Sequence, residues 1–188
     1  MRNKDTGVTS VTTVVNVVGS GNLNTELDLD TLYQLFKRLD RIIDLSNSNS
    51  RIKLSIKNVE GTIIIFRTGK YNIMGCSSCD ELKNTNGELV GILSNSDVID
   101  SLTSVVFSPT NYVYTVDLKH EINLNSLDVL LDKEAEYEPE QYPFVIYRPS
   151  TLNCTMTLSS SGKCVVNSPK GREAVEEILN LLKPHLKK

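Results

Sequence analysis

Ile-Ile-Ile-Phe-Arg-Thr-Gly-Lys, residues 63–70, is a β-branched strand that runs into a tight glycine turn. Residues 155–163, Thr-Met-Thr-Leu-Ser-Ser-Ser-Gly-Lys, present the same arrangement later in the chain. Because Thr-Gly and Ser-Gly favour turns, each stretch predicts a strand, a turn and the start of a second strand. Two such hairpins suggest a supersecondary unit that the chain uses twice.

The duplication extends from these hairpins towards the start of each half. Asn-Val-Val at 16–18 and Leu-Asp-Leu at 27–29 correspond to Asn-Tyr-Val at 111–113 and Ile-Asn-Leu at 122–124. The offset stays at about 93–95 residues throughout. This fixed spacing predicts a pseudo-symmetric pair that shares one continuous sheet. The expected organisation is a flexible N-terminus at 1–10 and repeats at 11–100 and 101–188.

The first repeat is expected to contain one long strand, two helices and three further strands. Asp28 or Asp30 can cap a first helix, in which apolar residues recur at helical spacing. A Ser/Asn run follows as a loop or turn, and Asn-Thr-Asn-Gly is expected to interrupt the second helix. The expected segments are a strand at 11–23, a helix with Leu32, Leu35, Phe36, Leu39, Ile42 and Ile43, a loop or turn at 46–50, strands at 51–57, 62–67 and 70–75, and a helix within 78–100.

The second repeat is expected to follow the same order. Pro169 suits the first turn of a closing helix whose apolar stripe is Val175, Ile178, Leu179, Leu182 and Leu186. The other expected segments are a strand at 104–119, a short helix near 125–132, and strands at 143–148, 152–159 and 163–167. Each half is therefore an α+β unit, with helices on one face of an antiparallel sheet.

Composition predicts a soluble, intracellular protein. The 188 residues can bury a sizeable core, and no stretch resembles a signal peptide or a membrane span. Four cysteines do not suggest a disulfide scaffold. The formal net charge of -3 argues weakly against affinity that comes mainly from phosphate neutralisation, although a local basic patch remains compatible with it.

No catalytic or metal-binding constellation stands out. Cys76 and Cys79 have the spacing of a zinc knuckle, but no second pair at matching spacing follows. His120 and His185 are isolated, and no nucleophile–base pair, phosphate loop or paired carboxylate site is present in the sequence. We therefore expect no enzyme activity, no metal and no cofactor.

The segment 137–148, Tyr-Glu-Pro-Glu-Gln-Tyr-Pro-Phe-Val-Ile-Tyr-Arg, resembles the Tyr-Glu-Pro-Glu-Leu-Phe-Pro-x-Leu-Ile-Tyr-Arg segment of the TATA-box-binding protein core. The turns 68–70 and 161–163 resemble the paired Ser-Gly-Lys turns of that family. The Asn-x-Val strands resemble its paired Asn-Ile-Val strands, and 27–29 its Leu-Asp-Leu. The resemblance covers about residues 11–187 in order.

This resemblance implies a saddle, in which two repeats share one curved antiparallel sheet and the helices lie on the convex face. It also implies a concave face that lies on the minor groove of DNA, inserts apolar wedges and kinks the duplex, which is a known property of the family. The implied DNA-binding residues are Asn16, Val18, Thr62, Ile64, Phe66, Lys70, Asn72, Met74, Asn111, Val113, Tyr142, Arg148, Thr157, Lys163, Val165 and Asn167.

The amides that the resemblance requires are present, whereas the wedges are only half present. Asn16 and Asn111 fall on the family's central asparagines, which reach adenine N3 and thymine O2. Phe66 and Tyr142 occupy two of four phenylalanine positions, while the other two fall on or near Asn49 and on Ser159.

Alternation makes the concave face of the second repeat more polar than the family pattern. Thr155, Thr157, Ser159, Val165 and Asn167 are expected there, with Met156, Leu158, Cys164 and Val166 towards the helices. At roughly 25 cal/mol per Å², the lost apolar contacts could remove a few kcal/mol of DNA binding.

Each of these residues also has a simpler interpretation. The asparagines could be plain strand residues, Phe66 could be a core aromatic, and Tyr142 could pack rather than wedge. Lys70, Lys163 and Arg148 could be solvated charges. Duplication favours the functional interpretation for the asparagines, and the adjacent turn favours an exposed Phe66.

The resemblance also implies protein partners. Glu138 and Glu140 match residues that face transcription factor IIB in the family, although the intervening leucine is replaced by Gln141. Both could equally belong to a solvated acidic face. A IIA-type partner and a homodimer through the concave face are further expectations. The segment 80–88 is acidic to neutral where the family is basic, so a partner that docks there on lysines and arginines would be lost.

Two functions fit these observations. The first is a divergent general transcription initiation factor that binds TATA-type promoter DNA, bends it and recruits a IIB-type factor. The alternative is a protein-interaction scaffold of the same fold with weak or no TATA binding. The expected location is the nucleus in a eukaryote, or the cytoplasm in an archaeon.

Overall fold

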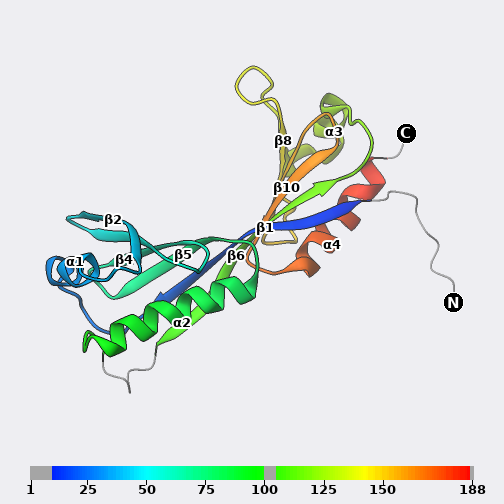
Figure 1. Cartoon of the computed structure of the whole chain (residues 1–188). Helices are drawn as coiled ribbons and strands as arrows, with labels where there is room; N and C mark the ends of the chain where they lie inside the picture. The colour runs from blue at the N-terminus through cyan, green and yellow to red at the C-terminus, as the bar shows by residue number, and fades with distance from the viewer. Residues whose placement is uncertain (1–9, 100–104, 187–188) are drawn as a thin grey trace, which may run out of the picture. The chain divides into compact units, whose positions relative to one another are not determined.

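The structure of the protein, a computed structural model, describes residues 10–99 and 105–186. The chain divides into two compact units (Figure 1). The first unit is Asn16–Thr110, and the second joins the chain up to Val15 with the chain from Asn111 onward. The long strands β1 (Val11–Asn22) and β6 (Val106–Asp117) each pass through both units. The expected flexible N-terminus lies, except for Ser10, outside the described residues.

The first unit packs two helices on one face of its strands. Its elements are α1 (Leu29–Lys37), β2 (Ile42–Ser48), β3 (Arg51–Ile56), β4 (Thr62–Phe66), β5 (Lys70–Cys76) and α2 (Cys79–Asn95). Asp28 caps α1, because its carboxylate accepts from the Asp30 backbone N–H at 3.1 Å and the Thr31 hydroxyl at 2.7 Å. Both helices pack on β3 and bury Leu32, Phe36, Leu82 and Leu89 against alternate strand residues such as Ile63 and Ile65.

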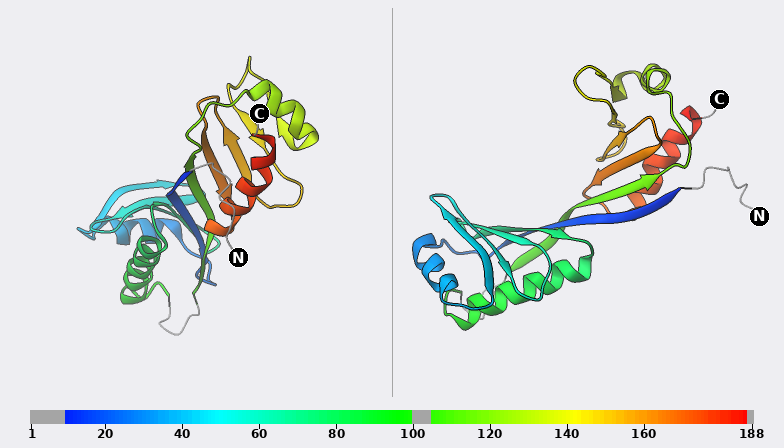
Figure 2. Two further views of the ribbon diagram at one scale, coloured as in Figure 1. Left: turned by 90° about the vertical axis from the view of Figure 1, so that its right-hand side faces the viewer. Right: turned by 45° about the horizontal axis from the view of Figure 1, so that its top comes forward.

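The second unit repeats the arrangement. Its elements are α3 (Leu124–Leu131), the 3₁₀ turn η1 (Asp132–Glu134), β7 (Ala135–Glu136), β8 (Val145–Tyr147), β9 (Thr155–Leu158), β10 (Lys163–Ser168), α4 (Arg172–Leu182) and η2 (Lys183–His185). Figure 2 shows α4 lying along β10. The core joins Met156, Leu158, Cys164 and Val166 to Ile178 of α4 and Leu127 of α3.

The described strands have the hydrogen-bonded order β2-β3-β4-β5-β1-β6-β10-β9-β8-β7. The pairs from β2 to β1 and from β6 to β7 are antiparallel. In each unit one sheet face is covered by helices, and we call the other the open face. Among the described residues, no helix has the length and apolar content needed to cross a bilayer.

The side chains of β1 and β6 exchange faces where the strands pass between units. Val14 packs on the core of the second unit, whereas Val17 is buried in the first, so the period-two alternation shifts by one residue between them. In β6, Phe107 stacks on the buried Tyr71 of the first unit, whereas Tyr112 packs on the core of the second, and Asn111 is the first residue of the second unit. Asn16 and Asn111 are thus the first residues after equivalent crossings.

The first helix was predicted too long. It ends at Lys37, and Ile42 and Ile43 instead begin β2, which includes the first part of the Ser/Asn run up to Ser48, while Asn49 and Ser50 form the turn. The backbone N–H groups of Arg38, Leu39 and Ile42 bond to carbonyls three residues earlier, which closes the helix in tight turns. The polar run is compatible with a strand because β2 is a sheet edge, where its side chains stay solvated.

The predicted interruption of the second helix is also wrong. α2 runs unbroken through Asn84-Thr85-Asn86-Gly87, because two of these polar side chains have partners outside the helix. The buried Thr85 hydroxyl donates to the Glu60 carbonyl at 2.6 Å, and the Asn86 amide accepts from the Tyr71 hydroxyl at 2.6 Å. The helix ends at Asn95, before the predicted limit.

Near the C-terminus, Pro169 lies before the closing helix rather than in its first turn. Gly171 is the N-cap of α4, and the Ser168 hydroxyl accepts from the Lys170 backbone N–H at 3.0 Å, which forms a turn after β10. The short strand β7 was not predicted, because two residues carry no periodic signal.

Burial of thiol and phenol groups gives a stability prediction for high pH. Burial raises the pKa of Cys164 to about 12 from its usual 9.0, and the pKa of Tyr71 to about 12 from 10.0. The unfolded chain therefore releases these protons first, so stability should hold below pH 9 and fall as pH rises towards 12. Urea unfolding between pH 8 and 11 should show this decline, and Cys164→Ala should flatten it. An unchanged slope in that variant would contradict the assignment.

Candidate nucleic-acid-binding face

Two asparagines on the open face of the first unit are held with a fixed orientation. The Asn16 carbonyl oxygen accepts from the Gly75 backbone N–H at 2.9 Å. The Asn72 carbonyl oxygen accepts from the Ser20 hydroxyl at 2.9 Å. Because both carbonyls are occupied within the unit, the amide NH₂ donors remain available to an acceptor on the open face.

Apolar side chains surround these amides. Ile64 pairs with Asn72 across β4 and β5, Thr62 pairs with Met74, and all four are half-buried on the open face. Val18 lies on this face too, because its neighbours Val17 and Gly19 are buried towards the helices. A hollow of about 430 Å³ opens between β2 and β5 and is lined by Thr62, Ile64 and Met74 together with polar residues of β2 and β3. Around Asn72 this face combines apolar side chains with amide donors, and towards β2 it becomes polar.

Phe66 lies at the end of β4, next to the β4–β5 turn. It pairs with Arg51 of β3, and its ring remains half-exposed. The core lies on the opposite sheet face, where Ile63 and Ile65 are completely buried. Phe66 is therefore an open-face aromatic and not a core residue, with exposed Lys70 just across the turn.

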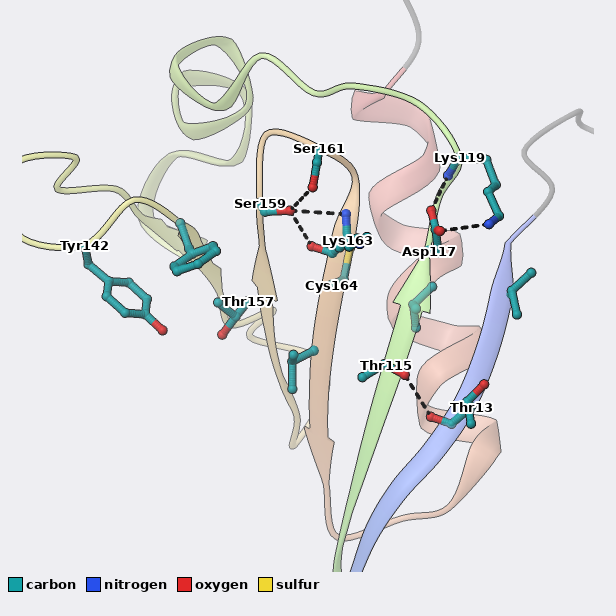
Figure 3. Close-up of a pocket in the computed structure, with 14 residues that line it drawn as sticks. Thr13, Thr115, Asp117, Lys119, Tyr142, Thr157, Ser159, Ser161, Lys163 and Cys164 are labelled. Atoms are coloured by element: carbon teal, nitrogen blue, oxygen red, sulfur yellow. Dashed lines mark hydrogen bonds and ion pairs between the residues drawn. The ribbon is translucent and has the colours of Figure 1, made fainter. Parts of the chain in front are cut away.

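The open face of the second unit carries a hollow of about 630 Å³ (Figure 3). Its floor is made by Thr157 of β9, Val165 of β10 and Thr115 of β6, which are neighbours in register, with Val11 and Thr13 of β1 alongside. The Thr115 hydroxyl donates to the Thr13 carbonyl at 3.5 Å. Met156, Leu158, Cys164 and Val166 are buried on the other face, so the predicted alternation of β9 and β10 is confirmed.

Ser159 sits where the first unit has Phe66, and its hydroxyl stabilises the β9–β10 turn. It lies 2.8 Å from the Ser161 hydroxyl, donates to the Lys163 carbonyl at 3.0 Å and accepts from the Lys163 N–H at 3.2 Å (Figure 3). A residue committed to the turn in this way has no apolar surface with which to enter a base step.

Aromatic residues border the hollow from the loop before β8. The rings of Tyr142 and Phe144 are 4.9 Å apart and tilted, and both line the hollow. Tyr142 is 45% exposed, so it remains partly accessible to a ligand. Phe144 was not among the predicted site residues, and because Pro143 and Phe144 form a bend before β8, strand alternation in the sequence does not indicate it.

The basic residues of the second unit differ in how they are paired. Lys163 is exposed and lines the hollow without an ion pair to another described residue. Lys119, also at the hollow, bonds to Asp117 at 2.8 Å, and this hydrogen bond holds the pKa of Asp117 below its usual value. The Arg148 guanidinium bonds to Glu136 at 3.0 Å, so its availability to phosphate is reduced.

The remaining predicted residues fall on the same faces or beside them. Val113 pairs with Asn167 on the open face of the second unit, and Asn111 lies two residues before it on that face. Glu138 and Glu140 lie in the exposed loop before β8, where the Gln141 amide donates to Glu138 at 2.6 Å. Asn49 is in the exposed turn between β2 and β3. Within the described ranges, no three His, Cys, Asp or Glu side chains gather as a metal site.

Known proteins of one family are similar to this chain in sequence and in structure. The family model described as transcription factor TFIID (or TATA-binding protein, TBP) matches residues 11–96 and 106–188. TATA-box-binding protein C of Halobacterium salinarum is 34% identical over 164 residues, which cover 87% of this chain and 90% of the relative. The TATA-box-binding protein of Pyrobaculum aerophilum is 33% identical over 178 residues, which cover 90% and 85%.

A solved structure agrees with the sequence relatives. Methanococcus jannaschii TBP superposes with a TM-score of 0.76 at 26% identity, covering 93% of this chain and 97% of that protein. The fold class expected from the sequence is confirmed by this match. With two repeats matched by one family model and archaeal relatives aligned over most of their length, the chain belongs to the TATA-binding protein family.

Proposed function

We propose that the chain is a general transcription initiation factor that binds the minor groove of TATA-type promoter DNA through its open faces. The observation that carries this proposal is the first-unit face, where Asn16 and Asn72 present NH₂ donors beside Ile64, Met74 and Phe66. The minor groove of A·T pairs offers only acceptors, adenine N3 and thymine O2, so amide donors match it.

Bending follows from the aromatic side chains. Phe66 in the first unit and Tyr142 in the second are the two proposed wedges, because each is an accessible ring at the border of an open face. Partial insertion would unstack a base step, and the new apolar contact would offset this cost. The polar surface around Thr157 and Ser159 makes the second unit the weaker contributor of apolar contact.

The experiment is binding of the purified chain to a fluorescent TATA duplex and to a G·C-rich control, with a dye pair that reports the bend. Salt-sensitive binding that prefers the TATA duplex and brings the dyes together is the expected result. Equal affinity for both duplexes would refute promoter recognition. The chain would then be better described as a protein-interaction scaffold of the same fold, and a IIB-type or IIA-type protein would be the partner to test.

The exposed lysines give a prediction about salt. Lys70 and Lys163 occupy equivalent places after the two turns, and neither forms an ion pair with another described residue. If each contacts a phosphate, Lys70→Ala or Lys163→Ala should weaken binding to all duplexes similarly and lower the slope of log K against log salt by about one. Lys183→Ala, near the C-terminal helix, is the control and should leave the slope unchanged. Equal slopes in all four proteins would exclude these phosphate contacts.

For partners, we propose that the loop carrying Glu138 and Glu140 contacts a IIB-type factor. Glu140 is exposed, whereas the carboxylate of Glu138 is already bonded to Gln141, so Glu140 is expected to contribute more. Homodimerisation through the open faces would compete with DNA, and sedimentation with and without the TATA duplex would detect it. Because the similar proteins named above are archaeal, cytoplasmic action in an archaeon is the favoured location.

A further inference from the structure

The two open faces differ in chemistry at equivalent positions of the repeats. Ile64 and Thr157 both lie in the middle of the strand that precedes the turn, and each pairs with the next strand, at Asn72 and Val165 respectively. Phe66 and Ser159 are likewise equivalent at the strand ends. The first unit therefore presents methyl groups and a phenyl ring where the second presents hydroxyl groups.

At the level of Ile64 the first unit offers amide donors and methyl groups to the groove, and the hydroxyl group of Thr62 lies two residues away along β4. The carbonyl oxygens of Asn16 and Asn72 already accept from Gly75 and Ser20, so the NH₂ groups are the ends of these amides that remain available to a ligand. A G·C pair differs from an A·T pair in the minor groove by the guanine N2 amino group, which is also a donor. Against amide donors and the Ile64 methyl groups, this amino group would lose its water without gaining a partner.

The second unit offers acceptors at the same level. No hydrogen bond joins the Thr157 hydroxyl to another described residue, and Thr115 uses only its proton, donating to Thr13 at 3.5 Å. Both hydroxyl oxygens line the hollow and keep lone pairs that can accept from a guanine amino group. Asn111 and Asn167 have no side-chain bond to another described residue, so either end of each amide can face the groove.

Resting on the proposed DNA binding, we propose that this chain recognises an asymmetric element, whose half under the first unit is restricted to A·T and whose half under the second unit tolerates G·C. The discrimination between A·T and G·C pairs depends on the guanine N2 amino group. The hydroxyl-lined hollow is thus a specificity feature of the second unit and not only a loss of apolar contact.

The test is a series of duplexes in which single A·T pairs are replaced, one position at a time, by G·C or by inosine·C, which lacks the amino group. We expect G·C to weaken binding about tenfold in one half of the element and less than threefold in the other. Inosine·C should remove the penalty in the restricted half. Similar penalties in both halves, or a penalty that inosine·C retains, would overturn the proposal.

Two reciprocal variants assign the halves to the units. The measured quantity is the ratio of affinities for the inosine·C and G·C duplexes at each position, which does not depend on overall binding strength. Ile64→Thr should lower this ratio in the restricted half, and Thr157→Val, nearly isosteric, should raise it about tenfold in the tolerant half. Val129→Thr, on the exposed surface of α3, should change neither ratio.

The outcomes separate the two proposals. If the wild-type chain fails to bind the all-A·T duplex, the proposed function fails and the asymmetric element falls with it. If the chain binds that duplex with salt sensitivity but Thr157→Val leaves the ratio unchanged, DNA binding stands and the inference is wrong. Circular dichroism of each variant verifies that it is folded.

Discussion

Replacement of Phe66 by alanine should abolish most of the DNA bend and weaken TATA binding on the order of a hundredfold, or about 2.7 kcal/mol. The reason is that Phe66 is the aromatic ring of the first unit at the proposed kink. The position that could supply a second ring lies in the β2–β3 turn and is occupied by the polar Asn49. Full burial of a phenylalanine side chain stabilises by about 1.5–3 kcal/mol, which is the contact that would be lost. Energy transfer between dyes on the duplex ends measures the bend, and anisotropy measures the affinity.

The reciprocal variant Ser159→Phe is the matched control for this loss. It restores a ring at the equivalent position of the second unit, so it should increase both the bend and the affinity for the TATA duplex. The urea midpoint of Phe66→Ala should stay near that of the parent, because the ring is half-exposed and lies outside the core. If Phe66→Ala keeps the full bend, Phe66 is a packing residue and the wedge must be assigned elsewhere.

The fold could be predicted largely because the same pattern of strands and turns is repeated in the two halves of the sequence. The hairpins at 63–70 and 155–163, with alternating apolar residues and turn glycines, correspond to β4–β5 and β9–β10. Alternation also assigned Thr157 and Val165 to one face and Met156 and Val166 to the other, as burial confirms. These signals are local, since period-two burial and turn chemistry depend on neighbours in the sequence.

The errors came from residues whose structure is decided by side-chain contacts or strand pairing and not by intrinsic propensity. Asn86 in α2 is compatible with a helix because it accepts from Tyr71, and Thr85 because it donates to Glu60. The first part of the Ser/Asn run, up to Ser48, is a strand because it pairs with β3 across the adjoining turn. Intrinsic propensity predicts an interruption in α2 and a loop or turn in β2. Side-chain contacts and strand pairing outweigh this propensity in the structure.

The sequence indicates which residues belong to the candidate site, but not how their side chains are oriented. Duplication and resemblance indicated Asn16, and strand alternation indicated Asn72, yet only the contacts with Gly75 and Ser20 fix which end of each amide is available. Likewise, sequence alone could not show that Arg148 is paired with Glu136. The difference in chemistry between the two open faces depends on these hydrogen bonds.

The largest effects on stability are expected at the two turn glycines, Gly69 and Gly162. Their φ angles are +76° and +79°, a region that costs an L-residue roughly 1–2 kcal/mol. A Cβ at Gly69 would also collide with the Thr25 carbonyl oxygen, and one at Gly162 with the His120 carbonyl oxygen. Both contacts are with backbone, which cannot move aside, because the Leu23 and Leu118 N–H groups bond to the glycine carbonyls at 2.9 and 3.0 Å.

Gly69→Ala and Gly162→Ala should therefore each destabilise the protein by about 3 kcal/mol or more. At this chain length the melting temperature should fall by roughly 6–12 °C, which calorimetry would measure. The matched control is Gly87→Ala in α2, where a Cβ meets nothing within 4 Å. Because alanine is the better helix former, this control should stabilise by up to about 1 kcal/mol. Replacing glycine by alanine should therefore lower the stability at a turn and raise it in a helix. A change in stability of the same sign at both places would show that the backbone conformation of the turns does not require glycine.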